Sequence, residues 1–161
     1  MVGRLAFRDT DHMPNDGTVV FNEISPEECL TLLDLADVGR IGVSVHALPV
    51  ILPVNYVIHD GDVVLRVSSG TKLAAATAGA VVAFEVDHHD HHGTSGWSVL
   101  VQGRAEEIVD PGELTQARML PLHSWAFDGS ADHYVRIRTA TISGRRFQPV
   151  EPGDRTDESI S

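Results

Sequence analysis

Residues 55–72 read NYVIHDGDVVLRVSSGTK, and this stretch predicts two β-strands joined by a tight turn and followed by the start of a helix. The turn falls at residues 59–62, where Gly61 can adopt a positive φ. Residues 63–67 alternate in polarity only partly, so that three aliphatic side chains share one face while Val64 and Arg66 share the other. The stretch therefore predicts a β-hairpin that leads into a polar loop.

That loop carries the side chains that an anion would need. The polar residues near the start of the predicted helix are Arg66, Ser68, Ser69, Thr71 and Lys72. Backbone N–H groups and the helix dipole favour an anion at a helix N-terminus, above all a phosphate. A capped turn with solvated charges would have the same sequence, so these residues alone leave both interpretations open.

The length and composition are those of a single soluble domain. The chain has 161 residues, of which 42% are hydrophobic and 22% are charged. Both ends are polar and rich in residues that do not favour regular structure. We therefore expect a flexible N-terminal arm over residues 1–20, a folded domain over 21–148 and a disordered tail over 149–161.

Charge and cysteine content exclude several classes of protein. The formal net charge of −11 at pH 7 argues against binding to nucleic acid or to an anionic membrane surface. No apolar run approaches the roughly 20 residues of a transmembrane helix, and the N-terminus lacks the apolar core of a signal peptide. The single cysteine, Cys29, excludes an intrachain disulfide and lies on the apolar face of a predicted helix, which favours a buried thiol. These features predict a cytoplasmic protein.

Two-residue periodicity predicts that most of the chain forms β-strands. Helices are expected to begin at Ser25 and Asp110, because each residue can cap a helix and is followed by proline at the first helical position. The predicted strands cover approximately residues 40–45, 50–58, 63–67, 80–86, 97–108 and 133–142. Because hairpins connect most of them, we expect a mainly β fold, a six-stranded antiparallel barrel with peripheral helices.

The predicted strand at 50–58 has an irregularity that could serve a ligand. Both of its faces are largely apolar, and Pro53 removes one hydrogen-bond donor from the ladder. The backbone of Val54, Asn55 and Tyr56 would then be open to hydrogen bonds from a flat polar ligand. An ordinary edge strand would explain the same residues equally well.

Two further clusters could bind a ligand or an ion. The run HHDHH at residues 88–92 contains ligands that zinc, nickel or copper accept, but it falls in a predicted flexible loop that would not fix the imidazoles. We therefore predict no physiological metal site. Arg136 and Arg138 share a strand face and could hold an anion, although the solvated exterior of a barrel would also place them there.

The order of these segments resembles that of the pyridoxamine 5′-phosphate oxidase-like split-barrel family of flavin-binding proteins. The resemblance extends over residues 24–147 and is carried by five segments: VGRIGVSV (38–45), LPVNYVI (52–58), LRVSSGTKL (65–73), VVAFEVD (81–87) and GWSVLVQGRAEEI (96–108). It implies a homodimer of split barrels with flavin mononucleotide (FMN) in the groove between the subunits.

The resemblance also implies roles for individual residues. Arg66, Ser68 and Lys72 would hold the FMN phosphate, with Ser69 and Thr71 assisting. The flavin ring would lie along Pro53, Val54, Asn55 and Tyr56 and take backbone hydrogen bonds, and Trp97 and Ser98 of the partner chain would close the pocket. No catalytic residue is identified; Tyr56 is a conceivable proton donor, but a role in ring stacking or in the core suits it better.

The activity that the resemblance implies is that of an FMN-dependent oxidoreductase. Such an enzyme would pass hydride or electrons between a reduced nicotinamide donor and a small molecule. The chain lacks the arginine-rich C-terminal segment with which pyridoxamine phosphate oxidases hold their substrate, so vitamin B6 oxidation is not expected. The alternatives are a deazaflavin-dependent reductase on the same fold and a non-catalytic protein that binds flavin or haem.

Overall fold

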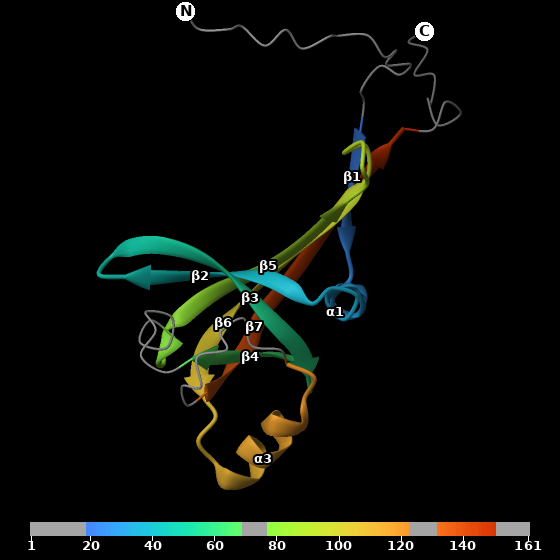
Figure 1. The fold of residues 1–161 in the computed structure, drawn as a ribbon. Coiled ribbons are helices and arrows are strands. Elements are labelled where there is room, and N and C mark those ends of the chain that lie inside the picture. The colour runs from blue at the N-terminus through green and yellow to red at the C-terminus, as the bar shows by residue number, and fades with distance from the viewer. Residues whose placement is uncertain (1–18, 69–76, 123–131, 151–161) are drawn as a thin grey trace, which may run out of the picture.

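A computed structural model describes residues 19–68, 77–122 and 132–150 of the chain. These residues form one antiparallel sheet of seven strands and two α-helices (Figure 1). The strands are β1 (Val19–Ile24), β2 (Val38–Val45), β3 (Leu48–His59), β4 (Asp62–Ser68), β5 (Val81–His89), β6 (Gly96–Glu107) and β7 (Asp132–Pro149). The helices are α1 (Pro26–Leu33) and α3 (Pro111–Met119).

Six of the strands close into a ring, which confirms the predicted barrel. The pairing order β7-β4-β3-β2-β5-β6 is closed by the pairing of β6 with β7. The seventh strand, β1, lies outside the ring along the C-terminal half of β7. The sequence prediction missed β1 and ended the last strand near residue 142, whereas β7 continues to Pro149. The predicted arm and tail otherwise lie outside the described residues.

The ring is held weakly at one seam. Strands β2 and β5 pair only from Arg40–Glu85 to Gly42–Ala83, whereas β2 pairs with β3 along its full length. The β2–β3 hairpin therefore projects beyond the ring, toward the left in Figure 1. Leu48 and Ile51 on this hairpin are 68% and 69% exposed, so the two largely apolar faces of this strand are not both covered within one chain.

Apolar side chains fill the ring, and α1 closes one end of it. Phe84 and Leu33 are the largest fully buried side chains. Helix α1 begins as predicted, because the Ser25 hydroxyl accepts a hydrogen bond from the backbone N–H of Glu28 at 3.2 Å. Cys29 is fully buried, as predicted, and burial raises the pKa of its thiol. Among the described residues, no helix is long and apolar enough to cross a membrane.

A second apolar cluster lies outside the ring and positions the site described below. It joins Val64 on β4 to α3 and its flanking residues, through Ile108, Ala117, Leu122 and Tyr134. Helix α3 begins at its predicted cap, where an Asp110 carboxylate oxygen accepts from the backbone N–H groups of Gly112 and Glu113 at 2.9 and 3.0 Å. The outer face of β4 is therefore covered, and it carries Arg66.

Candidate functional site

A cavity of about 470 Å³ lies beside β3, between the end of α1 and the segment that follows α3. Its polar lining comes from Asp34 and Asp37 after α1 and from Asn55 and Tyr56 on β3, and Leu120 and Pro121 form the opposite wall. Two residues of the predicted flavin strand thus border a cavity of the size that small-molecule sites have.

The edge of β3 is open next to this cavity. Strand β3 pairs with β4 only from Tyr56 onward, whereas its pairing with β2 covers all of its residues from Leu48 to Asn55. The β3–β4 ladder therefore does not extend to residues 53–55. The pairing with β2 continues through Pro53 without a bulge, so the predicted irregularity is an open edge. Such an edge can exchange hydrogen bonds with a flat ligand.

The structure places Arg66 and Ser68 on the strand that adjoins this edge. Tyr56 pairs with Leu65, so Asn55 and Arg66 are the next residues along their strands. The Arg66 side chain is partly buried, and its Nη1 donates to the carbonyl oxygen of Leu122 at 3.4 Å. A partly buried guanidinium favours an anion through charge-assisted hydrogen bonds. The other predicted phosphate ligands, Ser69, Thr71 and Lys72, lie outside the described residues.

Tyr56 has a structural role that its sequence position only partly indicated. Its ring packs edge-on against Phe84, with 4.8 Å between the centroids, and its hydroxyl donates to the carbonyl oxygen of Leu33 at 2.5 Å. Burial raises the pKa of the hydroxyl, and the carboxylates of Asp34 and Asp37 raise it further. The side chain therefore holds α1 against the ring. The backbone N–H of Tyr56 donates to the carbonyl oxygen of Asp37 at 3.4 Å, so it is not left for a ligand either.

We predict that Tyr56→Phe lowers the free energy of unfolding by about 1 kcal/mol, since it removes one buried hydrogen bond and leaves the ring in place. Urea denaturation followed by circular dichroism measures this difference. Tyr134→Phe is the matched control, because Tyr134 is also buried but its hydroxyl makes no hydrogen bond within the described part of the chain. Equal losses in the two variants would contradict the role assigned to Tyr56.

Trp97 and Ser98 lie away from the cavity beside β3. Trp97 packs partly against the core of the ring, and Ser98 is exposed on the outer face of β6. Neither residue lines the cavity in its own chain. This arrangement is compatible with the expectation that they act on the partner chain, which stays a prediction.

The histidine-rich run is more ordered than a flexible loop. His88 and His89 belong to β5, and the Asp90 carboxylate accepts hydrogen bonds from the Thr94 hydroxyl and backbone N–H at 2.6 and 2.8 Å. These hydrogen bonds lower the pKa of Asp90. The Asp90 carboxylate therefore stabilises the turn. Among the described residues, no group of three His, Cys, Asp or Glu side chains is placed to hold a metal ion.

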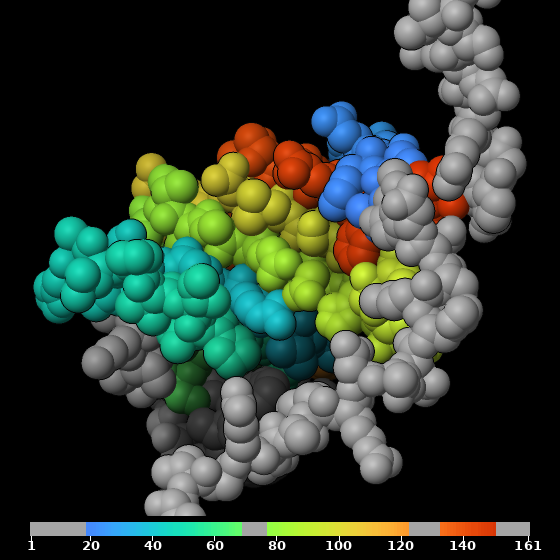
Figure 2. Space-filling view, turned by 90° about the horizontal axis from the view of Figure 1, so that it is seen from above, coloured from blue at the N-terminus to red at the C-terminus, as the bar shows by residue number. Residues whose placement is uncertain are grey.

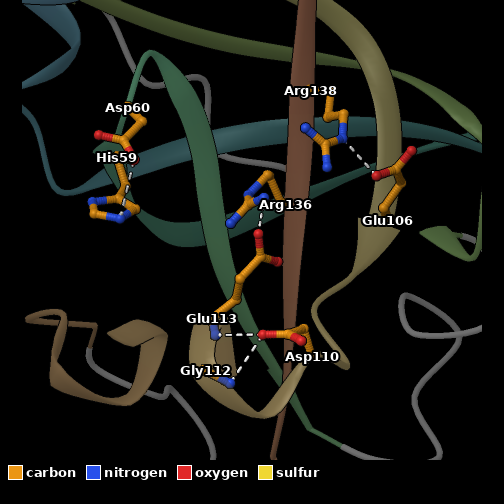
Figure 3. A network of polar contacts seen from close by, with 8 residues as sticks. All are labelled: His59, Asp60, Glu106, Asp110, Gly112, Glu113, Arg136 and Arg138. Atoms are coloured by element: carbon orange, nitrogen blue, oxygen red, sulfur yellow. Dashed lines mark hydrogen bonds and ion pairs between the residues drawn. The ribbon is translucent and has the colours of Figure 1, made fainter. Parts of the chain in front are cut away.

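Arg136 and Arg138 each pair with a glutamate instead of forming a joint anion site (Figure 3). Arg136 Nη1 lies 3.3 Å from Glu113 Oε1, and Arg138 Nε lies 2.7 Å from Glu106 Oε2. The first pair joins β7 to α3, and the second joins β7 to β6. Their positive charges are therefore already neutralised by protein carboxylates.

Comparison with known proteins gives the family of this chain. The family model described as pyridoxamine 5′-phosphate oxidase matches residues 25–146. The chain belongs to this family. An uncharacterized protein of Mycobacterium tuberculosis, Rv0080, is 36% identical over 130 residues, which are 78% of this chain and 84% of that protein.

Two solved structures share both fold and sequence with the chain. An FAD binding protein from Mycobacterium smegmatis is 36% identical, with a TM-score of 0.70 over 79% of this chain and 100% of the other. A putative pyridoxamine 5′-phosphate oxidase from Corynebacterium glutamicum is 30% identical, with a TM-score of 0.71 over 81% and 96%. The split-barrel resemblance inferred from the five sequence segments is thus confirmed.

Proposed function

We propose that the protein is a flavin-dependent oxidoreductase with FMN as its cofactor. The observation that carries the proposal is the open edge of β3, which lies beside Arg66 and Ser68 on β4 and borders a cavity of about 470 Å³. Membership of the pyridoxamine 5′-phosphate oxidase family and the 36% identity to an FAD binding protein support it. When bound, the flavin would accept and donate the electrons, and the protein would bind and orient it.

The residues of the chain divide into two binding roles. Arg66 and Ser68, with the predicted Ser69, Thr71 and Lys72, would hold the phosphate through charge-assisted hydrogen bonds. The backbone of residues 53–55 would hydrogen-bond the polar edge of the flavin ring. The reaction would pass electrons from a reduced nicotinamide donor to a small acceptor in a cytoplasmic setting.

The cofactor test uses the visible spectrum of the purified protein before and after incubation with FMN and desalting. We expect a retained flavin absorbance that corresponds to one flavin per chain. Release of the bound flavin and its chromatography distinguish FMN from FAD. A protein without flavin absorbance after this treatment would contradict the proposal; binding of deazaflavin, or a Soret band, would then favour the alternative cofactors.

A non-catalytic flavin-binding protein is the second candidate, and the engagement of Tyr56 favours it. With the Tyr56 hydroxyl bonded to Leu33, the carboxylates of Asp34 and Asp37 are the only other titratable groups in the described lining of the cavity. Neither carboxylate makes a side-chain hydrogen bond within the described residues that would identify it as a proton donor. Turnover of NADH with a panel of quinone and nitroaromatic acceptors decides between the two candidates, because the second predicts tight binding without turnover.

We also propose that the protein is a homodimer. The outer face of β2, β3 and β5 exposes Val38, Ile51 and Val81, which are 44–73% exposed, around the small residues Gly42 and Ala83. Figure 2 shows β2, β5, β6 and β7 side by side on one face, in the order in which they pair. A second copy of the chain would remove this apolar surface from water.

We predict that Ile51→Asp converts the dimer to a monomer, because it places a charge on the exposed apolar surface, next to Gly42. Size-exclusion chromatography with light scattering measures the mass. Met119→Asp is the control, since Met119 is 83% exposed on α3 and lies outside this face. A wild-type protein that elutes as a monomer would contradict the proposed dimer.

A further inference from the structure

A groove runs along β5, β6 and β7. Its first part lies on the side of the sheet opposite to the core, and its second part also contacts Trp97, which packs against the core. It consists of two adjoining hollows of about 380 and 310 Å³, which share Ser98. Arg145 lies in the first hollow, and Phe147 lies in the second. The two residues alternate along β7, so their side chains point to the same face.

One end of the groove has a flat aromatic wall. Gly96 pairs with Phe147, and the Phe147 ring covers the position where a side chain of Gly96 would lie, with Cζ 2.7 Å from an ideal Cβ. Phe21 on β1 pairs with Phe147 from the other side, and the two ring centroids are 6.0 Å apart. His89 lies across Gly96 on β5. The Phe147 ring fills the space above Gly96, and because Phe147 is only partly buried, a planar group can stack on the face of the ring that is turned away from Gly96.

The other end of the groove carries a cation. Arg145 is exposed, pairs in register with Ser98, and makes no hydrogen bond or ion pair within the described ranges. Two carboxylates also line the groove, those of Glu85 and Asp87, and they share a single cation, the guanidinium of Arg40, which offsets one of their two charges.

The remaining carboxylate near Arg145 is that of Glu23, its register partner on β1. It is exposed and forms no ion pair with Arg145 in the described part of the chain. The guanidinium of Arg145 and the hydroxyl of Ser98 are thus both placed to accept an anionic ligand, and the aromatic wall begins next to them.

We propose that this groove binds an adenylate group. Its 5′-phosphate would take charge-assisted hydrogen bonds from Arg145 and a hydrogen bond from Ser98, and its adenine would stack against Phe147. A simple anion would use only the Arg145 end, whereas a nucleotide uses the cation, the hydroxyl and the aromatic wall together.

The source of the adenylate rests on the proposed function. Ser98 is one of the residues expected to close the flavin pocket of the partner chain, so the adenylate half of FAD bound by one subunit would extend into the groove of the other. The adenylate half of the nicotinamide donor has the same chemistry. The two sources predict different competition results.

The test is calorimetric titration of the full-length protein with AMP. We expect AMP to bind, and we expect Arg145→Ala and Phe147→Ala each to weaken its binding at least tenfold. Arg118→Ala is the matched control, because Arg118 is an exposed arginine on α3, outside the groove, and its loss leaves AMP affinity unchanged. Circular dichroism melting curves establish that each variant is folded.

Further titrations identify the source. If the adenylate belongs to FAD, the wild type binds FAD more tightly than FMN, Arg145→Ala removes that difference, and FMN affinity itself stays the same. If it belongs to the donor, NADH competes with AMP and reduced nicotinamide mononucleotide does not. Absence of AMP binding by the wild type, or wild-type AMP affinity in folded Arg145→Ala, would overturn the proposal. Because AMP is titrated alone, its result is independent of whether FMN binds.

Discussion

Gly103→Ala is expected to lower the free energy of unfolding by about 3 kcal/mol, the upper end of the range for overpacked cores. Gly103 lies on β6 at an irregularity in the pairing with β7: Gln102 pairs with Thr141, but Gly103 pairs with Thr139. At this bulge the two backbones approach so closely that a Cβ on Gly103 would lie 1.9 Å from the carbonyl oxygen of Arg138. A backbone atom cannot turn away as a side chain can, so the ring must open locally or the pairing must shift.

Urea denaturation followed by circular dichroism measures this effect, and Gly42→Ala is the matched control. Gly42 also lies in a strand of the ring, but the nearest atoms to its ideal Cβ are 3.7 Å away, which is an ordinary contact. We expect the control to change stability by less than about 0.5 kcal/mol. Similar stability of the two variants would show that the close approach at Gly103 is not needed for the fold.

The six strands of the ring and both helix starts could be predicted because their signals are local. Two-residue alternation marks a strand wherever one face is buried, and Ser25 and Asp110 form the predicted caps with the backbone N–H groups that follow them. Gly61 adopts the positive φ that its turn requires. None of these features depends on a residue distant in sequence.

Features that depend on distant residues were missed. Strand β1 exposes five of its six residues, so it shows no alternation, and only its pairing with β7 makes it a strand. Val64 lies on the face of β4 that the sequence left open, and it is buried because α3 covers it. The turn after His89 is ordered by hydrogen bonds between Asp90 and Thr94, which a run of histidines does not reveal.

The candidate site was predictable in part for the same reasons. Alternation and the turn at Gly61 suffice to place Asn55 and Arg66 on neighbouring strands. The open edge of β3 follows from the short β3–β4 pairing, which no local pattern predicts. The sequence does not distinguish FMN, FAD and deazaflavin. Each of these cofactors would offer a phosphate to Arg66 and a planar ring to the β3 edge.

Arg66→Ala is expected to weaken FMN binding about tenfold to a hundredfold, which corresponds to about 1.5–3 kcal/mol for a charge-assisted hydrogen bond to phosphate. Arg66 is partly buried and tied to the carbonyl oxygen of Leu122, so its guanidinium is held in place before the ligand arrives. Arg66→Lys should retain part of the affinity, because it keeps the charge but loses the fork of donors. Fluorescence titration of FMN with each variant measures the dissociation constants.

Arg136→Ala is the matched control for this experiment. Arg136 pairs in register with Val64, two residues from Arg66 on the same strand face, but its guanidinium is bonded to Glu113. Its loss should leave FMN affinity unchanged and cost at most about 1 kcal/mol of stability. If Arg66→Ala and Lys72→Ala both bound FMN as the wild type does, the phosphate would have to lie elsewhere, and the loop after β4 would lose its assigned role. A loss in Arg66→Ala alone would instead show that β4 itself, which pairs on both sides within the ring, supplies the anchor, and that the loop only adds to it.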